Sequence, residues 1–176
     1  MAYANDRLKT LRKIVFVLTA PALLTAMAAS GTGWGAEGSS SAARQAEVAT
    51  RGAQVMPFDL EQTMHVFQSL EDGGLQTVSA KDPADREQIA LIQAHLKEEA
   101  DKFQQGNFSD PAKIHGEEMP GLAALRTGAG HINIQYTPLP HGAQLRYTTD
   151  DAALVRAIHA WFMAQRADHG HHASGH

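Results

Sequence analysis

The sequence contains no cysteine among its 176 residues. This absence excludes disulfides, thiolate-bound iron–sulfur clusters and zinc sites, cysteine nucleophiles, and covalent attachment of haem through a Cys-x-x-Cys-His motif. Imidazole, carboxylate and thioether groups remain as the side-chain ligands for a metal. The chain is comparatively rich in imidazole, because it carries ten histidines.

Positive charge is also scarce. Lys and Arg number 15 against 19 Asp and Glu, which gives a formal net charge of −4 with histidine neutral. The chain therefore has no basic footprint for binding nucleic acid. It also lacks a G-x-S-x-G elbow, a P-loop, a G-x-G-x-x-G loop and an H-E-x-x-H helix. The sequence thus offers no recognisable catalytic motif, and a binding protein is favoured over an enzyme.

The N-terminus is typical of an exported protein. An apolar run from Ile14 to Ala29 follows a basic segment and is shorter than the ~20 residues that a spanning helix needs. Ala26-Met27-Ala28 fits a signal-peptidase site. We predict a signal peptide at residues 1–36, with an uncleaved anchor as the alternative. The protein would then be periplasmic or secreted, without membrane insertion after cleavage.

The rest of the chain divides into three parts. Residues 37–55 are rich in Gly, Ser and Ala and predict a flexible linker. Residues 56–170 have the length of a single folded domain. Residues 171–176 are polar and histidine-rich, and predict a disordered tail.

The domain itself shows the pattern ββα, an irregular insert, then ββα. Strand alternation and turn residues predict two hairpins, and each hairpin is followed by an amphipathic helix. Asp82 is expected to cap the first helix and the segment Thr149-Asp150-Asp151 the second. We predict an α+β fold in which one four-stranded antiparallel sheet carries both helices on one face. The strands are expected at residues 64–70, 75–78, 131–136 and 143–148, and the insert at 108–130.

The most distinctive stretch runs from His115 to Gly121. His115 and Met119 are four residues apart, so they share a face if the segment forms a helical turn. Imidazole and thioether together suit copper, or haem iron as an axial pair. The alternative interpretation is that Met119 fills a gap in the core and His115 caps a turn.

Two further histidines recur at matching places near the middle of each predicted helix. These are His95 and His159, and we expect them to converge with His115 and Met119 on one metal. For each of them alone, a half-buried histidine with one hydrogen bond is the commoner case. Three histidines near the C-terminus, His169, His171 and His172, are expected to capture Cu²⁺, Ni²⁺ or Zn²⁺ loosely, because a disordered tail must be ordered on binding.

Other polar residues are expected to face solvent. His65 and His131 open matching strands, where a histidine is usually exposed. The adjacent carboxylates Glu98-Glu99 and Glu117-Glu118 point about 100° apart on a helix, so they do not form a catalytic pair.

Several short segments stand out along the domain: Gln76-Thr77-Val78, Ala94-His95-Leu96, Ile114-His115-Gly116, Met119-Pro120-Gly121-Leu122 and His159-Ala160-Trp161-Phe162. In these segments the chain resembles a largely uncharacterised family of small exported bacterial proteins, many of which carry the name aspartate carbamoyltransferase. The resemblance implies one coherent domain over residues 56–170. The Ser-Thr-Arg-Thr phosphate-binding sequence of the true carbamoyltransferase does not occur in this chain, so the resemblance implies no particular chemistry.

The sequence therefore predicts an extracytoplasmic, non-catalytic protein that binds a transition metal, with copper as the first choice and haem as the second. Its partners would be the metal ion itself or a protein that donates or accepts the metal. A small enzyme of unknown reaction and a metal-free interaction domain remain open as alternatives.

Overall fold

The computed structural model describes the backbone of residues 34–176 and the side chains of residues 41–176. The predicted signal peptide therefore lies outside the described residues except for positions 34–36. Within the described part of the chain, no helix is both long and apolar enough to cross a bilayer.

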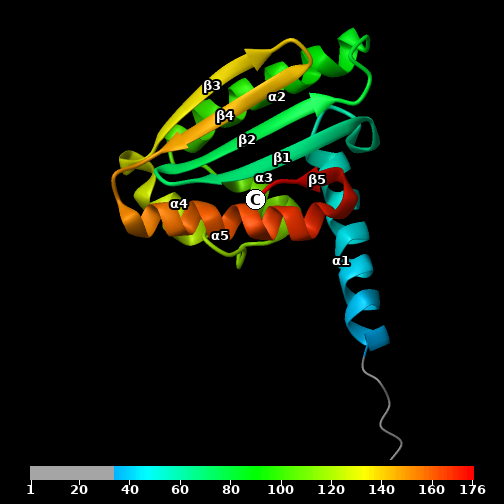
Figure 1. The fold of residues 1–176 in the computed structure, drawn as a ribbon, viewed down its shortest axis with the longest axis horizontal. Coiled ribbons are helices and arrows are strands. Elements are labelled where there is room, and N and C mark those ends of the chain that lie inside the picture. Colours follow the sequence, from blue (N-terminus) through cyan, green and yellow to red (C-terminus); the bar gives the residue numbers. More distant parts are fainter. Residues whose placement is uncertain (1–33) are drawn as a thin grey trace, which may run out of the picture. The chain divides into compact units, whose positions relative to one another are not determined.

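The fold is α+β, and its element order contains the expected ββα–insert–ββα series (Figure 1). Two short helices, α3 and α4, form within the insert. The helices and strands are α1 (Trp34–Val55), β1 (Thr63–Leu70), β2 (Gly73–Ala80), α2 (Arg86–Gln104), α3 (Ser109–His115), α4 (Leu122–Gly128), β3 (Asn133–Leu139), β4 (Gly142–Thr148), α5 (Ala152–His169) and β5 (Ala173–Ser174). Three 3-10 turns join them: η1 (Leu60–Gln62), η2 (Ala129–His131) and η3 (Gly170–His172).

The strands form a single mixed sheet in the order β3-β4-β2-β1-β5. In the series β3, β4, β2 and β1, neighbouring strands pair antiparallel. The pairing of β2 with β4 joins the two hairpins at the centre of the sheet. The predicted four-stranded antiparallel sheet is thus only part of the observed one, because β5 adds a fifth strand parallel to β1.

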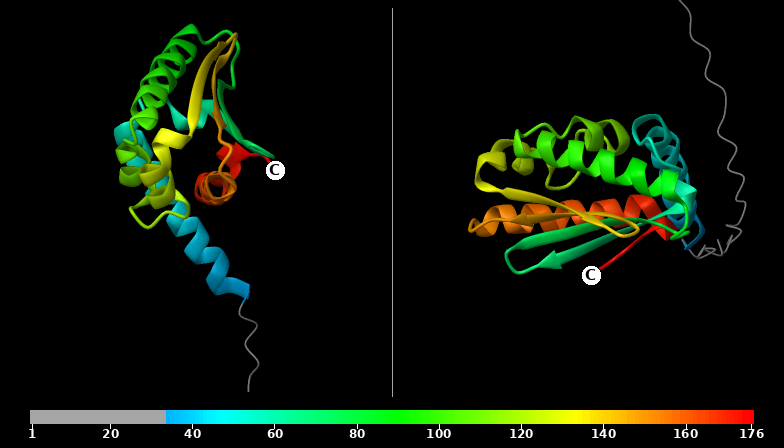
Figure 2. Two further views of the ribbon diagram at one scale, coloured as in Figure 1. Left: turned by 90° about the vertical axis from the view of Figure 1, so that its left-hand side faces the viewer. Right: turned by 90° about the horizontal axis from the view of Figure 1, so that it is seen from above.

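The two long helices that follow the hairpins, α2 and α5, cover the same face of the sheet. Alternate side chains on this face, such as Phe67, Val78, Leu145 and Tyr147, are buried in the core. α2 packs mainly on β3 and β4, whereas α5 packs on β1 and β2 (Figures 1 and 2). Each helix therefore covers the hairpin of the other ββα unit, and the two units share one core.

Most of the apolar residues spaced three or four apart on α2 and α5 are buried, as the spacing predicts. On α2 the buried positions include Glu99 among the apolar residues, which is contrary to its expected exposure. The start of α2 also differs from prediction, because the carboxylate of Asp85 accepts from Gln88 N at 3.0 Å and caps the helix. Asp82 instead accepts from Ala84 N in the preceding turn. Asp151 caps α5 as predicted.

Residues 37–55 are not a flexible linker but belong to α1. Alanine, glutamate, glutamine and arginine in this segment favour a helix, and α1 packs against α3 and α5. Val48 is 1% exposed and anchors its buried side. The sequence interpretation missed this helix because so few apolar residues mark its inner face, and much of its contact is made by Arg44.

Residues 171–176 are not a disordered tail. They form η3 and β5, and β5 pairs with the edge strand β1. Ser69 N donates to the carbonyl of His176 at 2.7 Å. Gly175 has φ +130°, and a Cβ there would lie 1.8 Å from Phe67 O. The segment is ordered because the edge of β1 offers unpaired backbone groups, which the sequence of the segment itself does not reveal.

Candidate metal centre

Four histidines gather where the end of α5 meets the start of β1. They surround a pocket of about 210 Å³ whose remaining walls come from α1 and η1. Three of the histidines come from the C-terminal segment, and the fourth projects from the inward face of β1. They are His65, His169, His171 and His172.

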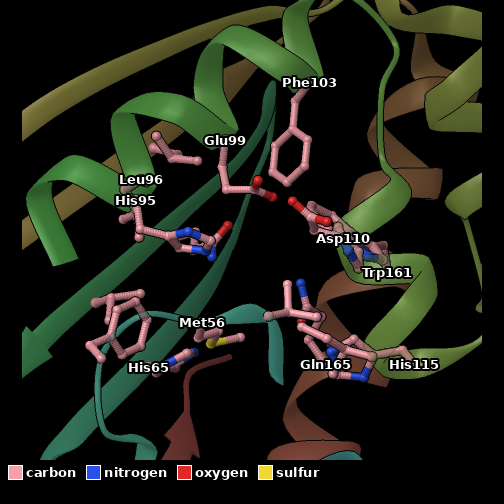
Figure 3. Close-up of a pocket in the computed structure, with 17 residues that line it drawn as sticks. Met56, His65, His95, Leu96, Glu99, Phe103, Asp110, His115, Trp161 and Gln165 are labelled. Atoms are coloured by element: carbon pink, nitrogen blue, oxygen red, sulfur yellow. The ribbon is translucent and has the colours of Figure 1, made fainter. Parts of the chain in front are cut away.

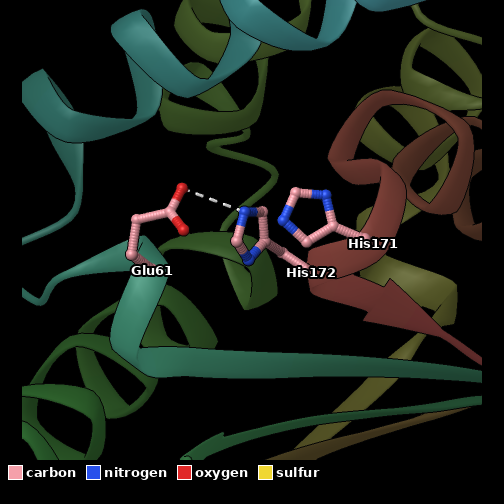
Figure 4. Close-up of side chains that lie close together, drawn as sticks. All are labelled: Glu61, His171 and His172. Carbon is pink, nitrogen blue, oxygen red and sulfur yellow. Dashed lines mark ion pairs between the residues drawn. The ribbon is translucent and has the colours of Figure 1, made fainter.

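Three side chains at this pocket bring potential metal-ligand atoms close together. One ligand atom each from Glu61, His171 and His172 lies within 4.8 Å of the other two (Figure 4). Glu61 Oε1 and His172 Nε2 are 3.0 Å apart, and the two imidazole ring centroids are separated by 3.8 Å. Among the described residues, this is the one group of three or more His, Asp or Glu side chains whose ligand atoms all lie within 4.8 Å of one another.

Unpartnered nitrogen atoms lie directly behind this group. His65 Nε2, His169 Nε2 and His172 Nδ1 are buried and have no hydrogen-bond partner among the described residues. The ring centroids of His65 and His169 are 5.0 Å apart. A buried polar atom without a partner costs roughly 1–3 kcal/mol, so this concentration of them makes the pocket a candidate binding site.

The buried imidazoles are held in the neutral form. Burial, together with the neighbouring imidazoles of His115, His172 and His95, lowers the pKa of His65 to about 3. Burial, together with neighbouring histidines, also lowers the pKa of His169 well below its ordinary value. Metal ions bind the deprotonated imidazole, so no proton has to be displaced from these two rings at neutral pH.

His115 sits beside this cluster with its orientation fixed. Its ring centroid is 5.0 Å from that of His169, and its Nδ1 donates to Asp168 at 2.8 Å. Although burial raises the pKa of Asp168, hydrogen bonds from His115 and Arg44 hold it well below its usual range. A carboxylate on Nδ1 leaves Nε2 as the free nitrogen, the arrangement common behind metal-ligating histidines.

The four residues predicted as ligands lie in different environments. His95 and His115 line one cavity beneath α2. His159 Nε2 instead bonds the carbonyls of Leu70 and Gly73, each at 2.9 Å, at the end of the first hairpin. Met119 is buried in the hydrophobic core. The expected convergence of His159 and Met119 with the other two is therefore not part of this fold.

Two residues of the centre escaped the sequence interpretation. His65 was expected at the surface but is 2% exposed. The signal was present, because His65 lies two residues before Phe67 and side chains two apart share a face of a strand. Glu61 carried no local signal, since its proximity to His172 depends on the pairing of β5 with β1.

No protein family, curated protein or solved structure matches this chain. The resemblance drawn from short segments therefore stays an expectation, and the functional assignment rests on the geometry of the described residues.

Proposed function

We propose that this protein binds a divalent transition metal ion, Cu²⁺ in preference to Zn²⁺, through Glu61, His171 and His172. The observation that carries the proposal is that these ligand atoms lie within 4.8 Å of one another. The unpartnered nitrogens of His65 and His169 at the same pocket support it. The C-terminal histidines, expected as an accessory site, become the principal ligands.

The donor set suits a borderline metal. Ligand atoms about 2.0–2.1 Å from a tetrahedral ion lie roughly 3.3 Å from one another, so small side-chain rotations bring the three groups into place. Imidazole and carboxylate ligands favour Cu²⁺ and Zn²⁺, and at a site of a given geometry Cu²⁺ binds more tightly. Because Met119 lies in the core, the geometry gives no support to a thioether ligand or to axial coordination of haem by His115 and Met119.

The proposed site suits exchange of the metal with a partner. The side chain of Glu61 is 70% exposed, so a bound ion would be accessible from solvent. Three protein ligands also leave a coordination position for a ligand from another molecule. These features support a protein that holds metal outside the cytoplasm and passes it to, or takes it from, a partner protein, in line with the export signal expected at residues 1–36.

The first experiment is titration of the untagged protein with Cu²⁺ and with Zn²⁺, followed by calorimetry and metal analysis after dialysis. We expect one tightly bound Cu²⁺ per chain and weaker Zn²⁺ binding. Glu61→Gln and the double variant His171→Ala/His172→Ala should weaken Cu²⁺ binding at least about tenfold. His131→Ala is the matched control, because His131 is an exposed histidine outside this pocket.

The comparison with His115→Ala separates this centre from the one expected from sequence. His115 is not one of the three residues whose ligand atoms lie within 4.8 Å of one another, so its loss should weaken binding less than loss of His171 and His172. Failure to take up stoichiometric Cu²⁺, or equal weakening by His131→Ala, would contradict the proposal.

A further inference from the structure

A second cavity lies on the inner side of the sheet, beneath α2. It has a volume of about 40 Å³ and is enclosed by α2, α3, α5 and the central strands (Figure 3). A single water needs roughly 10–15 Å³ measured with a water-sized probe. This space therefore holds about three water-sized groups, which is the size of a small organic molecule.

Two helices present polar side chains to this cavity at the spacing of one helical turn. His95 and Glu99 lie four apart on α2, and Trp161 and Gln165 lie four apart on α5, so each pair shares a helix face. All four line the cavity. The cavity is thus a meeting point of two helix faces that carry polar groups where apolar packing would be expected.

A buried hydrogen-bond donor at this cavity is left without a partner. Trp161 is fully buried, and its Nε1, which can only donate, has no partner among the described residues. Gln165 is 5% exposed and also lines the cavity. Buried donors are nearly always satisfied, so Trp161 Nε1 is a donor for which an acceptor is missing.

The carboxyl groups at the cavity favour a neutral ligand over a cation. Figure 3 shows the carboxyl groups of Glu99 and Asp110 turned toward each other. Both oxygens of Asp110 are already taken, by Lys102 at 2.7 Å and Lys113 at 2.8 Å. Burial, with the neighbouring Asp110, raises the pKa of Glu99 to about 7, so part of the Glu99 population is an O–H donor at neutral pH.

We propose that this cavity binds a small neutral molecule through a carbonyl oxygen that accepts from Trp161 Nε1 and the Gln165 amide. Phe103 and Leu145, which also line the cavity, would contact the apolar part of the ligand. His65 lines both this cavity and the metal pocket. Neither Trp161 nor Gln165 lines the metal pocket, so variants at these two positions test the cavity without replacing a residue of the metal pocket.

The test uses acetamide as the probe and nitrogen-15 NMR of the full chain as the readout. The indole N–H resonance of Trp161 is identified by its loss in Trp161→Phe. Acetamide should shift this resonance in a saturable manner. Gln165→Leu, similar in volume, should weaken acetamide binding about fivefold or more through loss of a hydrogen bond. Gln135→Leu, at an exposed position of β3, should leave it unchanged.

Two further probes of similar size decide the ligand class. Methylammonium and acetate should each bind more weakly than acetamide. Tighter binding of methylammonium would make this a cation site and overturn the proposal. Absence of a saturable shift with all three probes, in the wild-type chain whose fold is intact, would show that the cavity holds only water and would equally overturn it.

Discussion

Arg44 on α1 holds Asp168 on α5 through two hydrogen bonds, from Nε to Oδ1 at 3.0 Å and from Nη2 to Oδ2 at 2.7 Å. The same Nη2 donates to the carbonyl of His115 at 2.6 Å. Because Asp168 also accepts from His115 Nδ1, one guanidinium joins α1, α3 and α5. The helix that composition suggested to be a linker thus supports the residues next to the candidate metal centre.

Replacing Arg44 should destabilise the fold. In Arg44→Leu, the half-buried carboxylate of Asp168 loses both of its guanidinium hydrogen bonds. We expect a loss of about 1–3 kcal/mol in the free energy of unfolding, since charge-assisted hydrogen bonds are strong but this pair is partly exposed. Urea unfolding followed by circular dichroism measures the change.

Arg51→Leu is the matched control for Arg44→Leu. Among the residues whose side chains are described, Arg51 pairs with Glu47 one turn away on α1, and such a pair contributes about 0.3–0.5 kcal/mol. Equal destabilisation by the two variants would show that Arg44 acts through helix propensity and not through Asp168.

Gly175→Ala should detach the C-terminal strand. A Cβ at Gly175 would meet Phe67 O at 1.8 Å, and its φ of +130° disfavours any side chain. We expect faster hydrogen exchange at the Ser69 amide, which donates to His176 O. We also expect weaker Cu²⁺ binding, because His171 and His172 lose their fixed positions.

Gly130→Ala controls for the general effect of adding a methyl group, because a Cβ at Gly130 has no atom within 4 Å. Exchange at Ser69 and Cu²⁺ affinity should both match the wild type in that variant. If Gly175→Ala changes neither property, the pairing of β5 with β1 is not needed for the metal centre.

Glu99 should make stability fall as the pH rises. Burial raises its pKa from 4.5 to about 7, so the folded state binds more protons than the unfolded state between these values. By linkage, the contribution of Glu99 to the free energy of unfolding is greatest below pH 4.5 and declines until about pH 7. At ~1.4 kcal/mol per pKa unit, the decline is about 3 kcal/mol at most.

The measurement for Glu99 is the difference in unfolding free energy between the wild type and Glu99→Gln at pH 5 and pH 8. The difference is needed because His65, whose pKa is lowered, contributes an opposite slope in the wild type and in the variant alike. The unfolding free energy of the wild type should fall relative to that of Glu99→Gln between pH 5 and pH 8. A difference that does not change with pH would mean that Glu99 is ionised throughout.

His159 should act in folding and not in metal binding. Its Nε2 bonds two carbonyls at the end of the first hairpin, so His159→Phe should cost about 1–2 kcal/mol of stability. Cu²⁺ stoichiometry and affinity should remain those of the wild type. Loss of Cu²⁺ in a variant that is still folded would restore His159 as a ligand.

The sequence alone determined the fold class and most of the element order. Period-two alternation in the strands and the 3.6-residue stripes of α2 and α5 are local signals, and each reflects which side of an element is buried. The cap at Asp151 is equally local. The spacing of the pairs that line the second cavity is also visible in the sequence. His95 and Glu99 are one turn apart on α2, and Trp161 and Gln165 are one turn apart on α5.

Tertiary structure alone decided the parts whose partners lie far away in the chain. α1 depends on packing against α3 and α5, with Arg44 reaching Asp168 across 124 residues. β5 exists because the edge of β1 offers backbone groups to pair with. That pairing also brings Glu61 to His172, so the candidate metal centre could not be predicted from spacing. Side chains that are distant in the sequence meet only once the strands that carry or flank them have paired in a fixed register.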